Sequence, residues 1–232
     1  MKTKELLSSW GIPFDAVNVE GNPSSLKELE RRGLRLVPVL TDGERFFHGW
    51  NPKELARFVG VEHREGKRLE TAELACRLLR ILAAAERAIL EVPPKGLKVK
   101  VPNRDRTVCD LAFHLFRLSL AYRDAVETRY FPESWLQETA PSEMHDGAAL
   151  ARYGEGVRKQ LTAWWARTDI SQDNIVTYYG CQTGPELLER TVWHAAHHLR
   201  QLYALIESMG STPRDPLANA DFEGLPLPHQ LW

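Results

Sequence analysis

Apolar residues recur every three to four positions through most of the chain between residues 71 and 210, which is the spacing of amphipathic helices. One predicted helix carries this pattern from Leu74 to Leu90 and is ended by Pro93-Pro94. Three more are predicted over residues 108–127, 147–167 and 185–210, with strand-like segments at 96–102 and 174–180. Thr107 or Asp105 is the predicted N-cap of the second helix. Four such helices bury their apolar faces most simply in a four-helix up-down bundle.

The first 61 residues follow another pattern, in which short helical and strand-like segments alternate. Asp42-Gly43 predicts a tight hairpin, and a serine after Pro23 is the expected N-cap of the second helix. Asn51 is the predicted N-cap of the third, which Gly60 ends. Helices are predicted over residues 3–10, 24–33 and 51–60, and strands over 14–19, 34–41 and 44–50.

These patterns predict an α+β multidomain fold, with an incomplete α/β module over residues 1–61 and the helical bundle over 71–210. The charged segment 62–70 lacks apolar periodicity and is the predicted linker. Residues 211–232 contain four prolines, so this tail is expected to be non-helical and to lie over the bundle, with Trp232 as an anchor.

Composition narrows the classes of function. Lys and Arg total 30 against 31 Asp and Glu, so no basic surplus indicates a nucleic-acid partner. No apolar run approaches the roughly 20 residues that span a bilayer, so we expect a cytoplasmic protein without membrane association. The three cysteines are far apart and are interpreted as reduced thiols, with Cys181 expected to be a small buried residue.

The last predicted helix contains three histidines within five residues. His194 and His198 are four residues apart and project from one helix face, so both can bind one ion. His114 lies among leucines of the second helix and is the predicted third ligand. Neutral imidazoles suit Zn²⁺, Ni²⁺ or Fe²⁺, and three protein ligands leave an open position. The alternative is a set of ordinary, partly exposed histidines.

Further polar residues accompany these histidines. His197 is interpreted as an outer-shell or exposed residue. Gln201 either orients a ligand or is a surface glutamine. Arg200 and Arg117 are candidate anchors for a substrate carboxylate, although arginines on helices are more often salt-bridge partners.

The segments "HAAHHLRQL" and "DLAFHLFRL" resemble the histidine segments of the DinB (YfiT-like) four-helix-bundle family. The resemblance covers about residues 71–209. It implies a divalent metal held by His114, His194 and His198, and it suggests a homodimer, because the family often forms dimers.

The N-terminal module resembles the glutaredoxin branch of the thioredoxin fold. Val37-Pro38 matches the family's cis-proline edge, which docks a thiol peptide, and "FHGWNPKEL" with Gly49 and Trp50 is similar to a later segment of glutaredoxins and NrdH-like redoxins. The family's first strand and its CxxC motif are not in this sequence, and residues 1–61 contain no cysteine. We hypothesise that the true start lies upstream and that Met1 is an internal methionine, which N-terminal sequencing of the native protein would test.

Three functions remain open at this point. The first is a metal-dependent enzyme in which glutathione or another low-molecular-weight thiol attacks a small electrophilic molecule, as in an S-transferase or a thiol-dependent isomerase. This function follows from both resemblances, because some DinB-like proteins use thiol cofactors. The second is a non-catalytic metal-binding or stress protein with a degenerate redoxin module. The third is a thiol-disulfide oxidoreductase, which requires an upstream CxxC.

Overall fold

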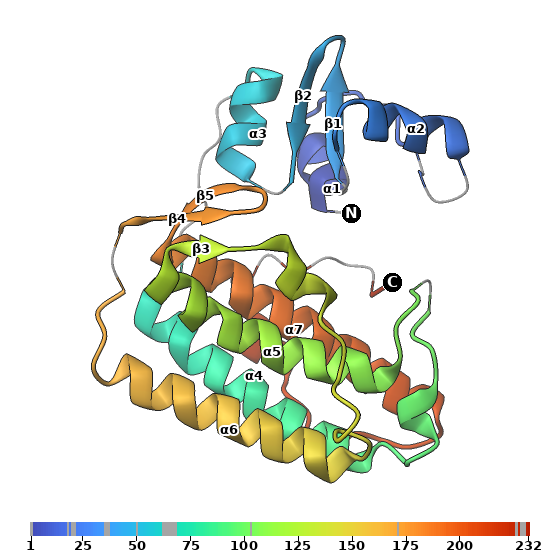
Figure 1. Ribbon diagram of the computed structural model, residues 1–232, viewed down its shortest axis with the longest axis vertical. Helices are drawn as coiled ribbons and strands as arrows, with labels where there is room; N and C mark the ends of the chain where they lie inside the picture. The colour runs from blue at the N-terminus through green and yellow to red at the C-terminus, as the bar shows by residue number, and fades with distance from the viewer. Residues whose placement is uncertain are drawn as a thin grey trace. The chain divides into compact units, whose positions relative to one another are not determined.

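The computed structural model describes residues 2–232 apart from 18, 20–21, 35–37, 50, 62–68, 103, 171, 226 and 228–230. The chain divides into two compact units, Met1–Lys67 and Arg68–Trp232 (Figure 1). The predicted linker, residues 62–70, falls at this division, and most of it lies outside the described residues. None of the described helices combines the length and apolar character needed to cross a membrane.

The N-terminal unit contains three helices and one β-hairpin among its described residues. Strands β1 and β2 are antiparallel with Asp42 opposite Arg45, so Gly43 and Glu44 form the turn, and Gly43 takes the positive φ of 59° that this tight turn requires. The elements are α1 (Lys2–Ser9), α2 (Pro23–Arg31), β1 (Val39–Asp42), β2 (Arg45–His48) and α3 (Pro52–Val59).

The N-cap prediction is confirmed for one helix of this unit and wrong for another. Asn51 caps α3 by accepting hydrogen bonds from the backbone N–H groups of Lys53 and Glu54. The cap of α2 is Asn22 and not a serine, because Pro23 fits the first helical position, where no backbone N–H is needed.

The predicted strand over residues 14–19 is not formed at residues 14–17 or 19, and residue 18 lies outside the described residues. A strand needs a neighbouring backbone to satisfy its N–H and C=O groups. Among the described residues of this unit, β1 and β2 pair only with each other, so no neighbour serves residues 14–17.

The C-terminal unit is built on four long helices that surround one core (Figure 1). Helices α4 and α5 lie on opposite sides of this core, and each packs against both α6 and α7. Thr107 caps α5 as predicted and Thr183 caps α7, each in a capping box with the acidic residue three positions later. The four helices are α4 (Thr71–Glu91), α5 (Val108–Thr128), α6 (Gly147–Trp165) and α7 (Gly184–Ser208).

A three-stranded sheet in the order β3-β4-β5 connects the end of α5 to the start of α7. Strand β3 (Tyr130–Phe131) follows α5 and pairs in parallel with β4 (Asn174–Thr177), while β5 (Gly180–Thr183) pairs antiparallel with β4 and leads directly into α7. Strand β4 was predicted, whereas β3 and β5 were not. The sheet fixes the C-terminal end of α5 beside the N-terminal end of α7.

Two other predictions for this unit need correction. The strand-like segment 96–102 forms a 3-10 turn, η1 (Gly96–Lys98), followed by a single β-bridge between Lys100 and Thr107. The tail was expected to be non-helical, but Asn219–Phe222 forms a 3-10 turn, η3. The tail does pack on the core of the helices, through Leu217, Phe222, Leu225, Leu227 and Trp232. A further 3-10 turn, η2 (Glu133–Gln137), follows β3.

Candidate metal centre

The three predicted histidine ligands meet between α5 and α7. His114 lies 14 residues before Thr128, the last residue of α5, and His198 lies 14 residues after Gly184, the first residue of α7. At a rise of 1.5 Å per residue, both lie about 21 Å from the helix ends that the sheet joins, so they reach the same level. One nitrogen each of His114, His194 and His198 lies within 4.8 Å of the others.

The distances suit a single ion. Nε2 of His194 lies 3.1 Å from Nε2 of His198. Nitrogen ligands about 2.0–2.1 Å from a tetrahedral Zn²⁺ lie about 3.3–3.4 Å apart, so this pair is already spaced for binding. The His114 ring centroid is 5.2 Å from the centroids of both His194 and His198. Small imidazole rotations would therefore bring all three nitrogens to a common ion.

Burial keeps the three imidazoles neutral. It lowers the pKa of His114 and of His194 well below the ordinary histidine value, and the neighbouring imidazoles and Arg190 lower both further. Burial also lowers the pKa of His198 to about 3, against the opposing effect of its hydrogen bond to Gln201. A neutral imidazole presents a lone pair at neutral pH, so a metal ion need not displace a proton from these nitrogens.

Gln201 fixes which nitrogen of His198 carries the proton. The Gln201 side chain is 7% exposed, and its Nε2 donates to the backbone carbonyl of Leu231 in the C-terminal tail. Only the amide nitrogen can face that carbonyl, so Oε1 must face His198 Nδ1, at 2.7 Å. Because Oε1 is an acceptor, Nδ1 carries the hydrogen, and the lone pair of neutral His198 lies on Nε2, the nitrogen that faces His194.

His114 has the properties expected of the third nitrogen ligand. His114 is 4% exposed, and its Nδ1 is buried without a hydrogen-bond partner among the described residues, which is rare for a polar atom unless another ligand satisfies it. His194 and His198 are only half-buried, so one side of the cluster stays accessible. Three neutral nitrogen donors with an accessible side match an open Zn²⁺-type site.

Of the other predicted site residues, one lies beside the histidine cluster and two do not face it in a way that the structure supports as a role in the site. His197 lies beside it, with its ring centroid 5.8 Å from that of His198. Arg117 donates to the Glu138 carboxylate at 2.6 Å and lies 3.3 Å from Asp124, so its charge is already paired. Arg200 is two positions after His198 and therefore projects about 200° away around the helix.

The predicted thiol-docking residues are described only in part. Gly49 N–H donates to the Pro38 carbonyl at 3.0 Å, which extends the β1-β2 hairpin by one pair. Val37 and Trp50 lie outside the described residues. Cys181 was expected to be buried, but it is exposed, because it lies on the edge strand β5 opposite the exposed Val176 of β4.

Arg190 was not predicted as a site residue, although it precedes His194 by four positions and so lies on the same face of α7. Its guanidinium lies 4.4 Å from the ring centroid of Tyr179 and donates to the Tyr178 hydroxyl at 2.7 Å. The spacing from His194 was the available signal. The aromatic contacts become apparent only once β4 and β5 fold.

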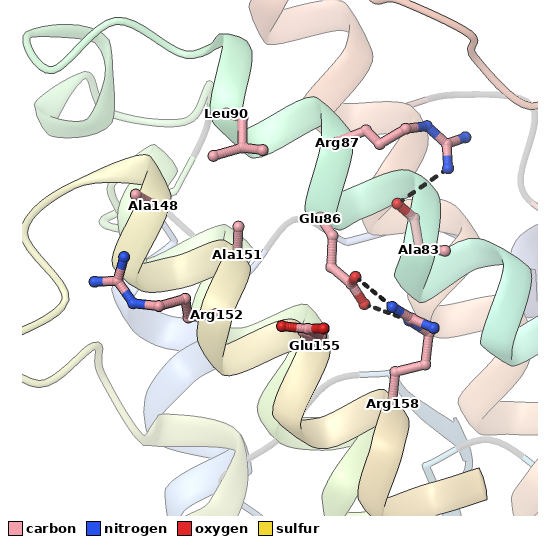
Figure 2. A pocket seen from close by; sticks show the side chains of 9 residues that line it. All are labelled: Ala83, Glu86, Arg87, Leu90, Ala148, Ala151, Arg152, Glu155 and Arg158. Atoms are coloured by element: carbon pink, nitrogen blue, oxygen red, sulfur yellow. Dashed lines mark hydrogen bonds and ion pairs between the residues drawn. The ribbon is translucent and has the colours of Figure 1, made fainter.

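A groove elsewhere in this unit does not contain the histidines. Figure 2 shows it between α4 and α6, with the Glu86 carboxylate facing the Arg158 guanidinium at 2.7 and 2.9 Å. This bidentate ion pair occupies both charged groups, so we interpret the groove as part of the α4-α6 packing. Its lining residues are Ala83, Glu86, Arg87, Leu90, Ala148, Ala151, Arg152, Glu155 and Arg158.

Comparison with known proteins concerns the N-terminal unit. A family model for glutaredoxins matches residues 1–47. The chain is 35% identical over 54 residues to the glutaredoxin-like protein NrdH of Lactococcus lactis subsp. lactis, which is 23% of this chain and 75% of that protein. It is 33% identical over 54 residues to the glutaredoxin-like protein NrdH of Lactococcus lactis subsp. cremoris, with the same shares of 23% and 75%.

Proposed function

The chain belongs to the glutaredoxin family through its N-terminal unit, and we propose that it is a metal-dependent enzyme that uses a low-molecular-weight thiol. Family membership gives this unit a thioredoxin-like fold. The finer proposal concerns the helical unit, which we assign to the DinB-like type of four-helix bundle. The observation that carries it is the neutral, partly accessible cluster of His114, His194 and His198.

The proposed chemistry is S-transfer. A divalent ion held at an open three-histidine site would lower the pKa of a thiol, so that the thiolate is present at neutral pH. The sulfur then forms a bond to an electrophilic carbon, the leaving group departs with the electrons of its own bond, and the thiol proton passes to solvent. In the isomerase version, the thiolate adds to a double bond and is later eliminated. Neither version needs an oxidant or a reductant.

The chain's own residues have distinct roles in this proposal. Gln201 holds His198 in the tautomer that presents Nε2, and the burial of His114 excludes water from one side of the site. In the N-terminal unit, the backbone edge at Pro38 is the proposed docking position for a thiol peptide such as glutathione. The Pro38 carbonyl already accepts the Gly49 N–H and proline has no N–H, so the backbone groups of the preceding Val37 would have to bind the peptide.

The test begins with metal content. Protein purified without a chelating tag is analysed by plasma mass spectrometry beside His194→Ala and His198→Ala, with His145→Ala as a control on an exposed histidine next to Asp146. Near-stoichiometric metal that only the two site variants lose supports the proposal. A panel of electrophiles is then assayed with and without glutathione. Metal-free wild type that cannot be reconstituted would remove the basis for the enzyme.

A second function, thiol-disulfide exchange, has the family membership in its favour, but the family's CxxC motif is not in this sequence, so the exchange would need another thiol. The three cysteines of this sequence are Cys76, Cys109 and Cys181, all in the helical unit. Reduction of a glutathione mixed disulfide by the purified chain, and loss of that activity in a Cys181→Ser variant, would favour exchange over S-transfer. Cys76 and Cys181 are both exposed and Cys109 is half-buried, so Cys76→Ser is tested beside Cys181→Ser, with buffered thiol as the reductant.

A further inference from the structure

Arg190 is a cation held by aromatic rings. Its guanidinium lies over the ring of Tyr179, 5.7 Å from the ring centroid of Tyr178 and 5.9 Å from that of Phe131. The hydrogen bond to the Tyr178 hydroxyl fixes one edge of the guanidinium. Cation–π contacts attract the guanidinium without neutralising its positive charge.

No carboxylate lies within ion-pair distance of Arg190 among the described residues, and its Nε is buried without a hydrogen-bond partner there. Other half-buried arginines of the same unit are paired: Arg117 contacts Glu138, and Arg158 contacts Glu86. A buried charge normally has a partner, because removing it from water is unfavourable. Arg106 is also half-buried without a carboxylate partner among the described residues, but it donates to the Leu136 carbonyl, whereas Arg190 keeps a buried Nε without a partner and lies on the same helix face as His194, which points to a ligand at Arg190.

Arginines lie close enough to the histidine cluster to act on its rings. Arg190 and Arg106 both act on His114, Arg190 also acts on His194, and Arg106 and Arg104 act on His198. These arginines contribute positive potential at the cluster, which favours anions there.

We propose that Arg190 binds the carboxylate of a small ligand whose reactive end reaches the cluster of His114, His194 and His198, so that the site selects carboxylate-bearing molecules. The guanidinium fork matches a carboxylate bidentately. Arg190 and His194 are separated by four residues, or about 6 Å along the helix axis, so the carboxylate and the reacting atom would be a few bonds apart. This inference deepens the proposed function and depends on it for the reaction, but not for carboxylate binding.

Two matched pairs of ligands test the inference by calorimetry. The first pair, measured on zinc-loaded protein, is 3-mercaptopropionate and 3-mercapto-1-propanol, which places the carboxylate on the thiol. The second pair, measured on both metal-free and zinc-loaded protein, is crotonate and crotonamide, which places it on the electrophile. We expect the charged member of one pair to bind wild type at least about tenfold more tightly. The preferred pair identifies which substrate carries the carboxylate.

Arg190→Gln should abolish this preference and leave the neutral member's affinity unchanged, whereas Arg190→Lys should retain part of it. Arg117→Gln is the matched control, because that arginine already has carboxylate partners. If Arg190→Gln fails to fold, the salt dependence of ligand affinity is measured on the wild type instead. Added salt should weaken binding of the charged member of the preferred pair and leave the affinity of the neutral member unchanged.

The outcomes separate the two proposals. Equal affinity within both pairs overturns the role of Arg190, even when zinc and thiols bind. Failure to bind zinc or either thiol, with crotonate still preferred over crotonamide, overturns the metal-dependent function and leaves the carboxylate site standing. Failure to bind any of the four ligands counts against both.

Discussion

Replacing Gln201 by leucine isolates the effect of tautomer control on the metal site. The leucine keeps approximately the same volume but cannot accept the hydrogen bond from His198 Nδ1, which is 2.7 Å long in a side chain that is 7% exposed. The His198 ring is then free to adopt either tautomer and either orientation. We expect zinc to bind more weakly while the protein remains folded.

Two free-energy estimates apply to Gln201→Leu: the cost of an unpaired buried donor and the loss of metal affinity. Leaving a buried donor without its partner costs about 1–3 kcal/mol. Loss of an outer-shell partner of a metal-binding histidine lowers metal affinity by roughly 10–100-fold, which is about 1.4–2.7 kcal/mol. The two ranges overlap, so the expected result for Gln201→Leu is a rise in the zinc Kd of roughly 10–100-fold.

The assay is competition for Zn²⁺ against a chromophoric chelator, with the Co²⁺ absorption spectrum as a report on geometry. Gln201→Glu should retain zinc affinity, because a carboxylate still accepts from Nδ1, but should lower the free energy of unfolding, because it cannot donate to the Leu231 carbonyl. Thr191→Val is the matched control: it removes a buried hydroxyl that donates only to Leu187 on the same helix. A zinc Kd for Gln201→Leu no higher than that of the Thr191→Val control would refute the reasoning.

Three further predictions concern stability. In α6, Gly154→Ala should destabilise by about 1–3 kcal/mol in denaturant melts, because its Cβ would lie 2.5 Å from the buried Phe116 ring, whereas Gly156→Ala, with nothing within 4 Å, should stabilise by about 0.5–1 kcal/mol; equal effects would contradict this. The free energy of unfolding of metal-free protein should fall as the pH is lowered from 6.5 toward 3, because the folded pKa of His198 is about 3 and the unfolded chain binds the proton first; a pH titration of melting temperature tests the sign. Thr107→Ala should cost about 1 kcal/mol in the same melts through loss of the α5 cap, and an unchanged midpoint would argue against the capping box.

Local sequence signals predicted the parts of the site that lie on single helices. The four-residue spacing of His194 and His198 needs only helical geometry, and the leucines around His114 indicate that its helix turns this face inward. The meeting of His114 with the other two required the relative level of α5 and α7, which depends on the β3-β4-β5 pairing. Strand β3 is only two residues long, and so short a segment carries no periodic signal.

Contacts between distant parts of the chain explain what could not be predicted. Arg190 was indistinguishable from any helical arginine until the Tyr178-Tyr179 turn and Phe131 came to lie against it. Residues 14–17 have the composition of a strand, but composition does not provide a partner, and none is present among the described residues of that unit. In both cases the deciding interaction is absent from the local sequence.

Gln201 shows most clearly how a distant contact turns an ambiguous residue into a specific one. From sequence, an orienting role and a surface role fitted it equally, because both place a glutamine seven residues after His194. The Leu231 carbonyl, 30 residues further along, takes the amide nitrogen and leaves only the oxygen for His198. The C-terminal tail thus determines a proton position on a candidate ligand by way of Gln201. Deleting Leu231 and Trp232 should therefore weaken zinc binding, although less than Gln201→Leu does, because the amide could still turn its oxygen toward Nδ1.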